Sequence, residues 1–326
     1  MSHLSVPPSS LPWSGDSVPL MLAPMQGLTN PALRTLFARW VRPDVLFTEF
    51  MRVAPGETAK RLSATDLREI APAELGIPLV VQLIGHGTAA LVAAARLARQ
   101  AGAAHLNLNL GCPFGRMTSG LTGGGMLRRP ELLQELLPAL RAEIRGGFSV
   151  KIRCGYDDPA QIFSLLPLFE SSGVDFLVLH PRTVLQEYDG TADHAVTARV
   201  VRQTSLPVIA NGDIRTTADA ERVLEMTGAA GLMLGRGAIA DPLLFQRVRG
   251  VAPSAPERAE RAAMLRHYLT ELLPLYRERF CGEQQVLGKL KSVLAVMDDA
   301  TFARQVKKLQ KCRSLQQFAE LVRELD

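Results

Sequence analysis

Polar side chains stand near the ends of several short apolar runs in this sequence, and their spacing is typical of a shared cavity. Residues two apart on a strand share a face, because side chains alternate across it. One run, L-N-L-N-L-G-C-P, also ends with a thiol, at Cys112. A cysteine has a pKa of about 8.5 and so keeps its proton at neutral pH, which suits a general acid. The paired positions are Asn107 and Asn109, Lys151 and Arg153, and His180 and Arg182.

Any one of these residues is more often a satisfied polar group at a strand end than a ligand. A lone cysteine, similarly, more often packs as a small hydrophobe. Several strands that end in polar side chains together favour a common site, because in a barrel they converge at the C-terminal mouth, where active sites lie. We therefore expect Cys112 to lie near Lys151 and His180. The other cysteines, Cys154, Cys281 and Cys312, are expected to be structural.

Eight short apolar runs alternate with segments of helical periodicity from Pro19 to about Phe245. Segments such as P-A-L-R-T-L-F-A-R-W place apolar residues three and four apart, as amphipathic helices do. This alternation predicts an α/β fold, a (β/α)8 TIM barrel over residues 18–248. An open doubly wound sheet is the alternative, but it would normally carry G-x-G-x-x-G after its first strand, where this chain has A-P-M-Q-G.

Two flanking segments lack the strand and helix alternation. Residues 1–17, rich in Ser and Pro, predict a flexible leader. After an A-P-S-A-P linker, residues 257–326 show helical periodicity only and predict a separate helical domain. Between 300 and 318 that domain carries no acid, and a run of this kind is either a solvated helix face or a contact to a polyanionic partner. Its basic residues are Arg304, Lys307, Lys308, Lys311 and Arg313.

The last two predicted strands end in N-G-D and G-R-G. In barrels the loops after the seventh and eighth strands often hold a phosphate, because glycine lets backbone N–H groups approach it closely. The sequence therefore predicts a phosphorylated ligand, with Arg236 as its charge partner.

The bulk composition indicates a folded protein with a sizeable core, since 47% of the 326 residues are hydrophobic and 21% are charged. A formal charge of +5 and a pI near 9.2 are compatible with a polyanionic partner, although many enzymes that bind no nucleic acid are equally basic. The four cysteines are far apart with no C-x-x-C pair, which argues against a metal site and a disulfide framework. Without a signal sequence or a run of about 18 apolar residues, we expect a cytoplasmic protein with no membrane association.

Nine motifs in order resemble the tRNA-dihydrouridine synthase family. They cover residues 20 to about 245, and the helical tail is similar in kind. Within the family, T-E-F-M-R-V and the three glycines at 123–125 are most similar to the C-type enzymes, which act on U16 of the tRNA D-loop. The motifs are A-P-M-Q-G-L-T-N, T-E-F-M-R-V, V-Q-L-I-G, L-N-L-G-C-P, T-G-G-G-M-L, V-K-I-R-C-G, L-H-P-R-T-V-L-Q-E-Y, I-A-N-G-D-I and M-L-G-R-G-A.

The resemblance implies an FMN-dependent enzyme, reduced by NADPH, that saturates the C5–C6 bond of uracil in tRNA. Cys112 would be the general acid and Asn109 would orient the uracil. Arg52 and Arg153 would touch the RNA, and Lys289 and Lys291 would grip its backbone. The implied FMN residues are Pro24, Met25 and Gln26 beneath the ring, Gln82 at its edge, Lys151 beside N1 and O2 with His180 nearby, and Asn211, Gly212, Asp213, Gly235 and Arg236 at the phosphate.

The chain departs from the family pattern at three places. It has Asn107 where Asp is more common, Pro181 where Gly or Ala is more common, and Phe114-Gly115-Arg116 where a Lys often follows the cysteine. These departures concern the RNA contacts and the loop path rather than the flavin site.

Two other functions fit parts of the same pattern. A phosphate-binding aldolase would use Lys151 as a Schiff-base nucleophile. A non-catalytic tRNA-binding protein would keep the basic tail but need no acid at Cys112. For the enzyme itself we expect a monomer without a metal ion.

Overall fold

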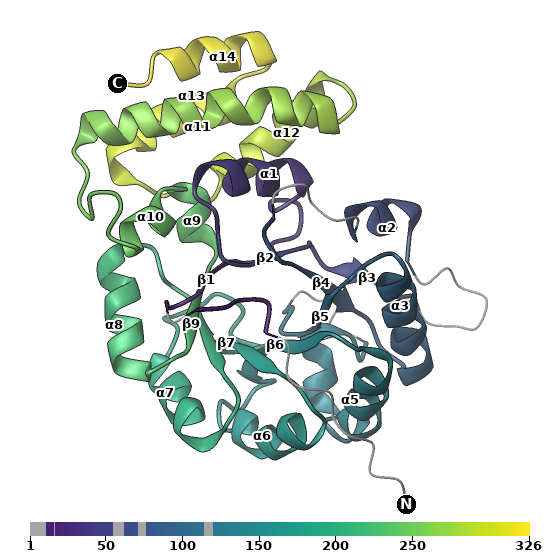
Figure 1. The fold of residues 1–326 in the computed structure, drawn as a ribbon. Coiled ribbons are helices and arrows are strands. Elements are labelled where there is room, and N and C mark those ends of the chain that lie inside the picture. Colours follow the sequence, from purple (N-terminus) through teal and green to yellow (C-terminus); the bar gives the residue numbers. More distant parts are fainter. Residues whose placement is uncertain (1–10, 16, 55–61, 71–75, 114–119) are drawn as a thin grey trace, which may run out of the picture.

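The fold is a closed barrel of parallel strands in a computed structural model that describes residues 11–15, 17–54, 62–70, 76–113 and 120–326 (Figure 1). The ring order is β1-β9-β8-β7-β6-β5-β4-β2, and a bridge between Met21 and Val45 joins its two ends. β3 continues the path of β2 alongside β4. The predicted eight-stranded barrel is thereby confirmed. The strands are β1 (Leu20–Leu22), β2 (Leu46–Phe47), β3 (Met51–Arg52), β4 (Leu79–Ile84), β5 (His105–Leu110), β6 (Gly147–Gly155), β7 (Phe176–Thr183), β8 (Val208–Asn211) and β9 (Gly231–Leu234).

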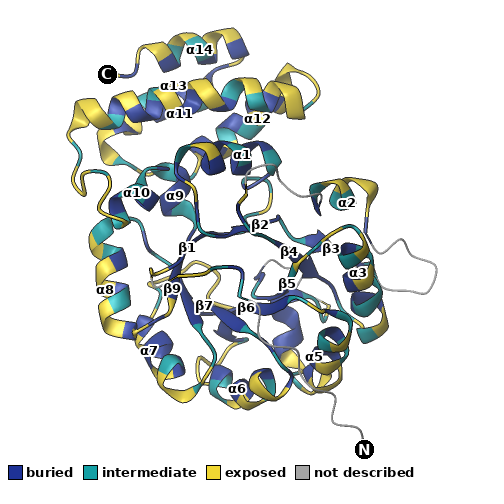
Figure 2. Ribbon diagram, in the orientation of Figure 1, coloured by how far each residue is buried: buried dark blue, intermediate teal, exposed yellow. Residues whose placement is uncertain are grey.

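Helices surround the barrel and bury the outer faces of its strands (Figures 1 and 2). Their inward stripes carry the apolar residues that the helical periodicity predicted. These helices are α1 (Pro31–Trp40), α2 (Ala64–Ile70), α3 (Thr88–Gln100), α5 (Glu131–Glu143), α6 (Gln161–Ser171), α7 (His194–Gln203), α8 (Thr217–Thr227), α9 (Arg236–Ala240) and α10 (Leu244–Val248), with a 3-10 turn, η1 (Gly123–Arg128).

Strand register sets the polar side chains at two neighbouring levels of the barrel. Asn109 of β5 pairs with Lys151 of β6, and Arg153 of β6 pairs with His180 of β7. After that pair the ladder skips two residues of β7 and resumes at Gly155 and Thr183. The skipped residues include Pro181, which has no N–H to donate, so the departure from the family pattern coincides with a bulge.

The N-terminal end of the barrel is covered by residues from the segment predicted as a leader. Leu11 and Trp13 pack against the interior cluster, and the Trp13 ring meets Phe176 edge-on with 4.9 Å between centroids. The first ten residues lie outside the part of the chain that the structure describes. Residues 11–13 therefore act as part of the barrel core.

Trp13→Ala is expected to lower the free energy of unfolding by about 2 kcal/mol, because it removes a half-buried indole from the end of the core. The midpoint of urea unfolding measures this change, and Trp13→Phe, which keeps an aromatic ring against Phe176, should retain most of the stability. A midpoint equal to that of the parent would show that the indole contributes nothing.

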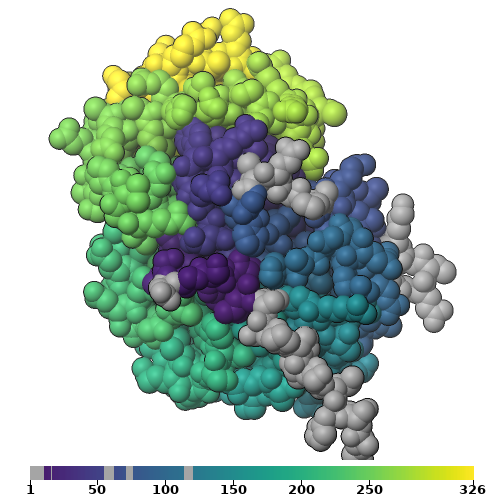
Figure 3. Space-filling model, in the orientation of Figure 1, coloured from purple at the N-terminus to yellow at the C-terminus, as the bar shows by residue number. Residues whose placement is uncertain are grey.

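The C-terminal tail is entirely helical and packs on α1 (Figures 1 and 3). Buried residues of the tail and of the barrel belong to one apolar cluster. Trp40 stacks on His267 with 4.4 Å between centroids, and Asn30 Nδ2 donates to the Tyr276 hydroxyl at 3.3 Å. The tail elements are α11 (Arg258–Arg279), α12 (Glu283–Leu294), η2 (Ala300–Phe302), α13 (Ala303–Lys311) and α14 (Leu315–Arg323).

Across the segments that the structure describes, no helix has both the length and the apolar character to span a membrane.

Candidate active site

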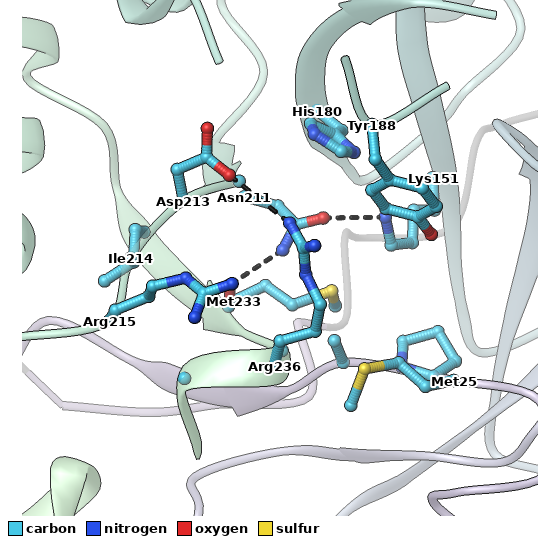
Figure 4. Close-up of a pocket in the computed structure, with 15 residues that line it drawn as sticks. Met25, Lys151, His180, Tyr188, Asn211, Asp213, Ile214, Arg215, Met233 and Arg236 are labelled. Atoms are coloured by element: carbon cyan, nitrogen blue, oxygen red, sulfur yellow. Dashed lines mark hydrogen bonds and ion pairs between the residues drawn. The ribbon is translucent and has the colours of Figure 1, made fainter. Parts of the chain in front are cut away.

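A cavity of about 590 Å³, part of it open to solvent, lies at the C-terminal ends of the barrel strands (Figure 4). It receives side chains from β6, β7, β8 and β9 and from the loop after β1. Nine of the predicted flavin residues line it, whereas Gln26 is exposed and Gln82 is fully buried behind it. The nine are Pro24, Met25, Lys151, His180, Asn211, Gly212, Asp213, Gly235 and Arg236.

Lys151 presents its amino group to the cavity. Its Nζ donates to Asn211 Oδ1 at 2.8 Å, and Asn211 Nδ2 donates in turn to the Met233 carbonyl at 2.8 Å. The side chain keeps some surface open to the cavity, but its ammonium is surrounded by protein atoms. This loss of hydration lowers the pKa of Lys151 to about 7, and repulsion from Arg153 adds to the shift.

His180 is a neutral base beside Lys151. Burial lowers the pKa of His180 well below its usual value, and the charges of Lys151, Arg153 and Arg182 lower it further. The His180 Nε2 atom lies 3.0 Å from a guanidinium nitrogen of Arg182. Because a guanidinium only donates, Nε2 is the acceptor and Nδ1 carries the proton.

Asp213 organises the arginines on the other side of the cavity. It accepts from Arg182 at 2.7 and 3.2 Å, from the Ala192 N–H at 2.8 Å and from Arg236 at 3.4 Å. Burial alone would raise the pKa of Asp213, but these hydrogen bonds outweigh it and the pKa is lowered. Both carboxylate oxygens are thus engaged with donors, so Asp213 orients Arg236 rather than facing an anion itself.

A buried ladder of amides links three neighbouring strands. Gln82 Nε2 donates to Asn107 Oδ1, Asn107 Nδ2 donates to Ser149 Oγ, and Asn109 Nδ2 donates to Gln82 Oε1, each at 2.8 Å. At position 107 the amide serves as acceptor and donor at once, which an ionised carboxylate cannot do. The departure from Asp is therefore accommodated within the ladder.

Cys112 is held at the end of this ladder. Asn109 Oδ1 accepts the N–H groups of Gly111 and Cys112, both at 3.0 Å, and so turns the chain out of β5. The cysteine is 8% exposed and packs against Ile84 and Phe50. Its charge interaction raises the pKa of Lys151, which reflects their proximity. The structure places Cys112 on the same rim as Lys151 and His180.

The glycines at 123–125 pack around Cys112. The Gly124 N–H donates to the Cys112 carbonyl at 3.2 Å. A side chain on Gly124 would come within 2.9 Å of that carbonyl and 2.6 Å of Val184, so only glycine fits there. Phe114, Gly115 and Arg116, the third departure from the family pattern, lie outside the described residues.

The residues predicted to contact RNA differ in burial and in their hydrogen-bond partners. Arg52 is exposed at the end of β3. Lys289 of α12 faces the loop after β1. Its Nζ would lie 3.8 Å from a Cβ atom added to Gly27. Arg153, in contrast, is buried and donates to the carbonyls of Gly111, Thr183 and Glu187. Lys291, half-buried like Lys289, donates to the Cys312 carbonyl of the tail at 2.7 Å.

Tyr188 lines the cavity but had no role assigned from sequence. It is 46% exposed, and the guanidinium groups of Arg153 and Arg236 lie 5.4 and 4.8 Å from its ring centroid. One feature of the sequence could have indicated a role for Tyr188. It is an aromatic residue among polar ones, at the end of the motif that begins with Leu179.

Among the described residues, no group of three or more His, Cys, Asp or Glu side chains could hold a metal ion.

A closed parallel barrel with cations and glycine loops at its C-terminal mouth has the architecture of a (β/α)8 enzyme. A family model described as Dihydrouridine synthase (Dus) matches residues 21–324, and the chain belongs to this family. This confirms the resemblance predicted from the motifs, and with it an oxidoreductase rather than an aldolase.

Several relatives match most of the chain. A probable tRNA-dihydrouridine synthase of Rhodobacter capsulatus is 34% identical, over 79% of this chain and 81% of its own length. A tRNA-dihydrouridine(16) synthase of Pseudomonas putida is 33% identical over 85% and 87%, and a tRNA-dihydrouridine synthase B of Vibrio cholerae is 33% identical over 79% and 81%. Among solved structures, morphinone reductase in complex with tetrahydroNAD has a TM-score of 0.51 at 15% identity, covering 78% of this chain and 93% of that chain. At that identity the likeness supports the barrel fold alone.

Proposed function

We propose that the chain is an FMN-dependent tRNA-dihydrouridine synthase that reduces U16 of the tRNA D-loop with NADPH as reductant. The observation that carries the proposal is a cavity lined by Lys151 and His180 in a chain of the dihydrouridine synthase family, with Cys112 held beside it by Asn109, the residue of β5 that pairs with Lys151. U16 is supported by the T-E-F-M-R-V motif and by relatives named for position 16, such as those of Pseudomonas putida and Cupriavidus necator.

The cavity fits FMN in three respects. Lys151 is a desolvated cation that forms no salt bridge with a described carboxylate, so it suits the electron-rich pyrimidine edge of the ring. Gly212 lines the cavity with a φ of +122° and has no side chain to cover its backbone, so its N–H can approach a ligand there. Arg236 at the start of α9 supplies positive charge for the phosphate.

When bound, reduced FMN would supply a hydride to uracil C6. The proton for C5 would then come from the Cys112 thiol, which the amide ladder fixes at the rim. Lys151 and Asn211 would hold the ring, with neutral His180 beside them. Asn109 uses its oxygen for the Cys112 loop and one amide hydrogen for Gln82, so its second amide hydrogen would meet the uracil.

The uracil must leave its stack to reach the rim, so the enzyme would bind an unstacked loop nucleotide and hold the rest of the tRNA by its phosphates. Tyr188, exposed at the cavity, would contact the extruded nucleotide, and Arg153 would act through Tyr188 and its loop. Basic residues on the exposed face of α13, with Arg52 and Lys289, would bind the backbone. The four free cysteines are consistent with a reducing cytoplasm, where we propose that the enzyme acts as a monomer.

The decisive experiment maps dihydrouridine in tRNA from a strain that lacks this gene, before and after complementation. Loss of dihydrouridine at position 16 and its return on complementation are expected. Loss at another position would overturn the U16 assignment, and no loss anywhere would overturn the activity. Yellow protein that releases FMN, bleached faster by NADPH than by NADH, would support the proposed cofactors.

Lys289→Ala is expected to weaken tRNA binding. It should also reduce the slope of log K against log salt by about 1, the contribution of one phosphate contact. Filter binding over a salt series measures both. Lys291→Ala is the matched control from the same helix, because Lys291 bonds to the Cys312 carbonyl; it should lower stability and leave the salt slope as it is. An unchanged slope in Lys289→Ala would remove this lysine from the RNA interface.

A further inference from the structure

Arg215 lines the cavity without a role in the function proposed so far. It lies in the loop between β8 and α8 and forms an ion pair with Asp298, which lies between α12 and η2 in the tail. Figure 4 shows Arg215 and Arg236 extending toward the same space. A side chain of the barrel that faces the cavity is thus held by a carboxylate of the tail.

The loops after β8 and β9 are pressed together at this end of the cavity. A side chain on Gly237, in the first turn of α9, would come 2.4 Å from the Ile214 carbonyl and 2.8 Å from Arg215 Cα. β8 and β9 are the seventh and eighth strands of the ring, and the loops after these strands hold phosphate in many barrels. Arg215 is therefore adjacent to the expected phosphate position.

The ion pairs at this end of the cavity leave the Arg215 guanidinium able to bind an anion. Asp213 is engaged by Arg182 and by Arg236, whereas Asp298 is 65% exposed and Arg215 is 34% exposed. An arginine has five donors, so one edge can bind a carboxylate while another binds a phosphate.

The loop that carries Asp298 is itself fixed to the tail. Its neighbour Asp299 forms an ion pair with Arg261 of α11 at 2.5 Å and accepts from the Thr301 N–H at 2.9 Å. Arg215 and Asp298 also line a second cavity, between barrel and tail, so their ion pair lies at the junction. Asp298 can hold the guanidinium in place only while the tail is docked.

We propose that Arg215 is a second ligand for the FMN phosphate and that Asp298 is a positioning residue that holds its guanidinium at the cavity wall. The proposal rests on FMN being the cofactor. It assigns the helical tail a part in retaining the cofactor, in addition to binding tRNA. A guanidinium that is already ordered loses less entropy when the phosphate binds.

The test compares FMN with riboflavin, which lacks the phosphate, by quenching of flavin fluorescence on flavin-free protein. Arg215→Ala should weaken FMN binding about tenfold or more and leave riboflavin binding within about twofold. Asp298→Asn should weaken FMN binding about threefold, and should have no effect when combined with Arg215→Ala. Arg222→Ala, which removes an exposed arginine of α8 paired with Asp219, is the matched control and should bind both flavins like the parent.

Equal effects of Arg215→Ala on both flavins, or none on either, would overturn the phosphate role. Tighter FMN binding by Asp298→Asn would overturn the positioning role, because Asp298 would then compete with the phosphate for Arg215. If Arg215→Ala does not fold, Arg215→Lys serves instead, with a smaller loss confined to FMN. A parent protein that binds neither flavin would contradict the proposed function rather than this assignment.

Discussion

Cys112→Ala is expected to lower dihydrouridine formation by about 10²- to 10⁴-fold while FMN and tRNA affinities stay within about twofold. The variant removes the only atom proposed to deliver a proton to C5, yet the Asn109 hydrogen bonds that shape this loop go to backbone N–H groups and survive the change. Single-turnover assays with FMN reduced in advance measure the loss at the chemical step.

Cys281→Ala is the control for that result, since it removes an exposed thiol in the tail, and it should retain the activity of the parent. Full activity in Cys112→Ala would exclude the thiol as the acid. A parallel loss of tRNA affinity would mean instead that Cys112 helps to shape the binding surface.

Lys151→Met is expected to lower uridine reduction by about 10²-fold or more, because it removes the cation at the proposed flavin edge. It should also change how stability depends on pH in flavin-free protein. The folded-state pKa of Lys151 is about 7, against 10.5 for an unburied lysine. Between these values the unfolded chain binds more protons, so this group makes the parent more stable as pH rises from about 7 to about 10.5.

The stability difference between Lys151→Met and the parent should therefore favour the variant most at pH 6 and shrink toward pH 10. Urea unfolding at a series of pH values measures it. Trp13→Phe, which exchanges one non-titrating side chain for another, should keep a constant difference from the parent. A constant difference in Lys151→Met as well would show that the lysine keeps an ordinary pKa when buried.

The barrel and the polar strand ends could be predicted from sequence because both follow from local periodicity. A strand such as His105–Leu110 alternates its side chains, and a closed parallel barrel brings such strand ends to one rim. Lys151 and His180 follow from this strand pattern, the N-G-D and G-R-G motifs indicate the five residues of the expected phosphate loops, and Pro24 and Met25 are implied by the motif resemblance alone. The placement of these residues depends on neighbours within the same strand or the next turn, which the local sequence shows.

The remaining features depend on partners far away in the chain. Tyr188 and Arg215 lie in loops, and nothing in their local sequence shows that one stands between two arginines and the other meets Asp298 of the tail. Lys291 has the same composition signal as Lys289 but bonds to the Cys312 carbonyl. Trp13 lies in a segment that its Ser and Pro content made look unstructured, yet it packs on Phe176.

The seam between α1 and α11 has a consequence for engineering substrate preference. The Trp40–His267 stack and the Asn30–Tyr276 hydrogen bond join α1 of the barrel to α11 of the tail. A hybrid that exchanged only residues after 257 would therefore pack the tail of one protein against the α1 of another, with unmatched contact residues. Grafts from relatives with another target position should carry the donor's α1 together with its tail. Hybrids that exchange α1 and the tail together would test whether the angle at which the tRNA docks on the enzyme is enough to select the modified nucleotide.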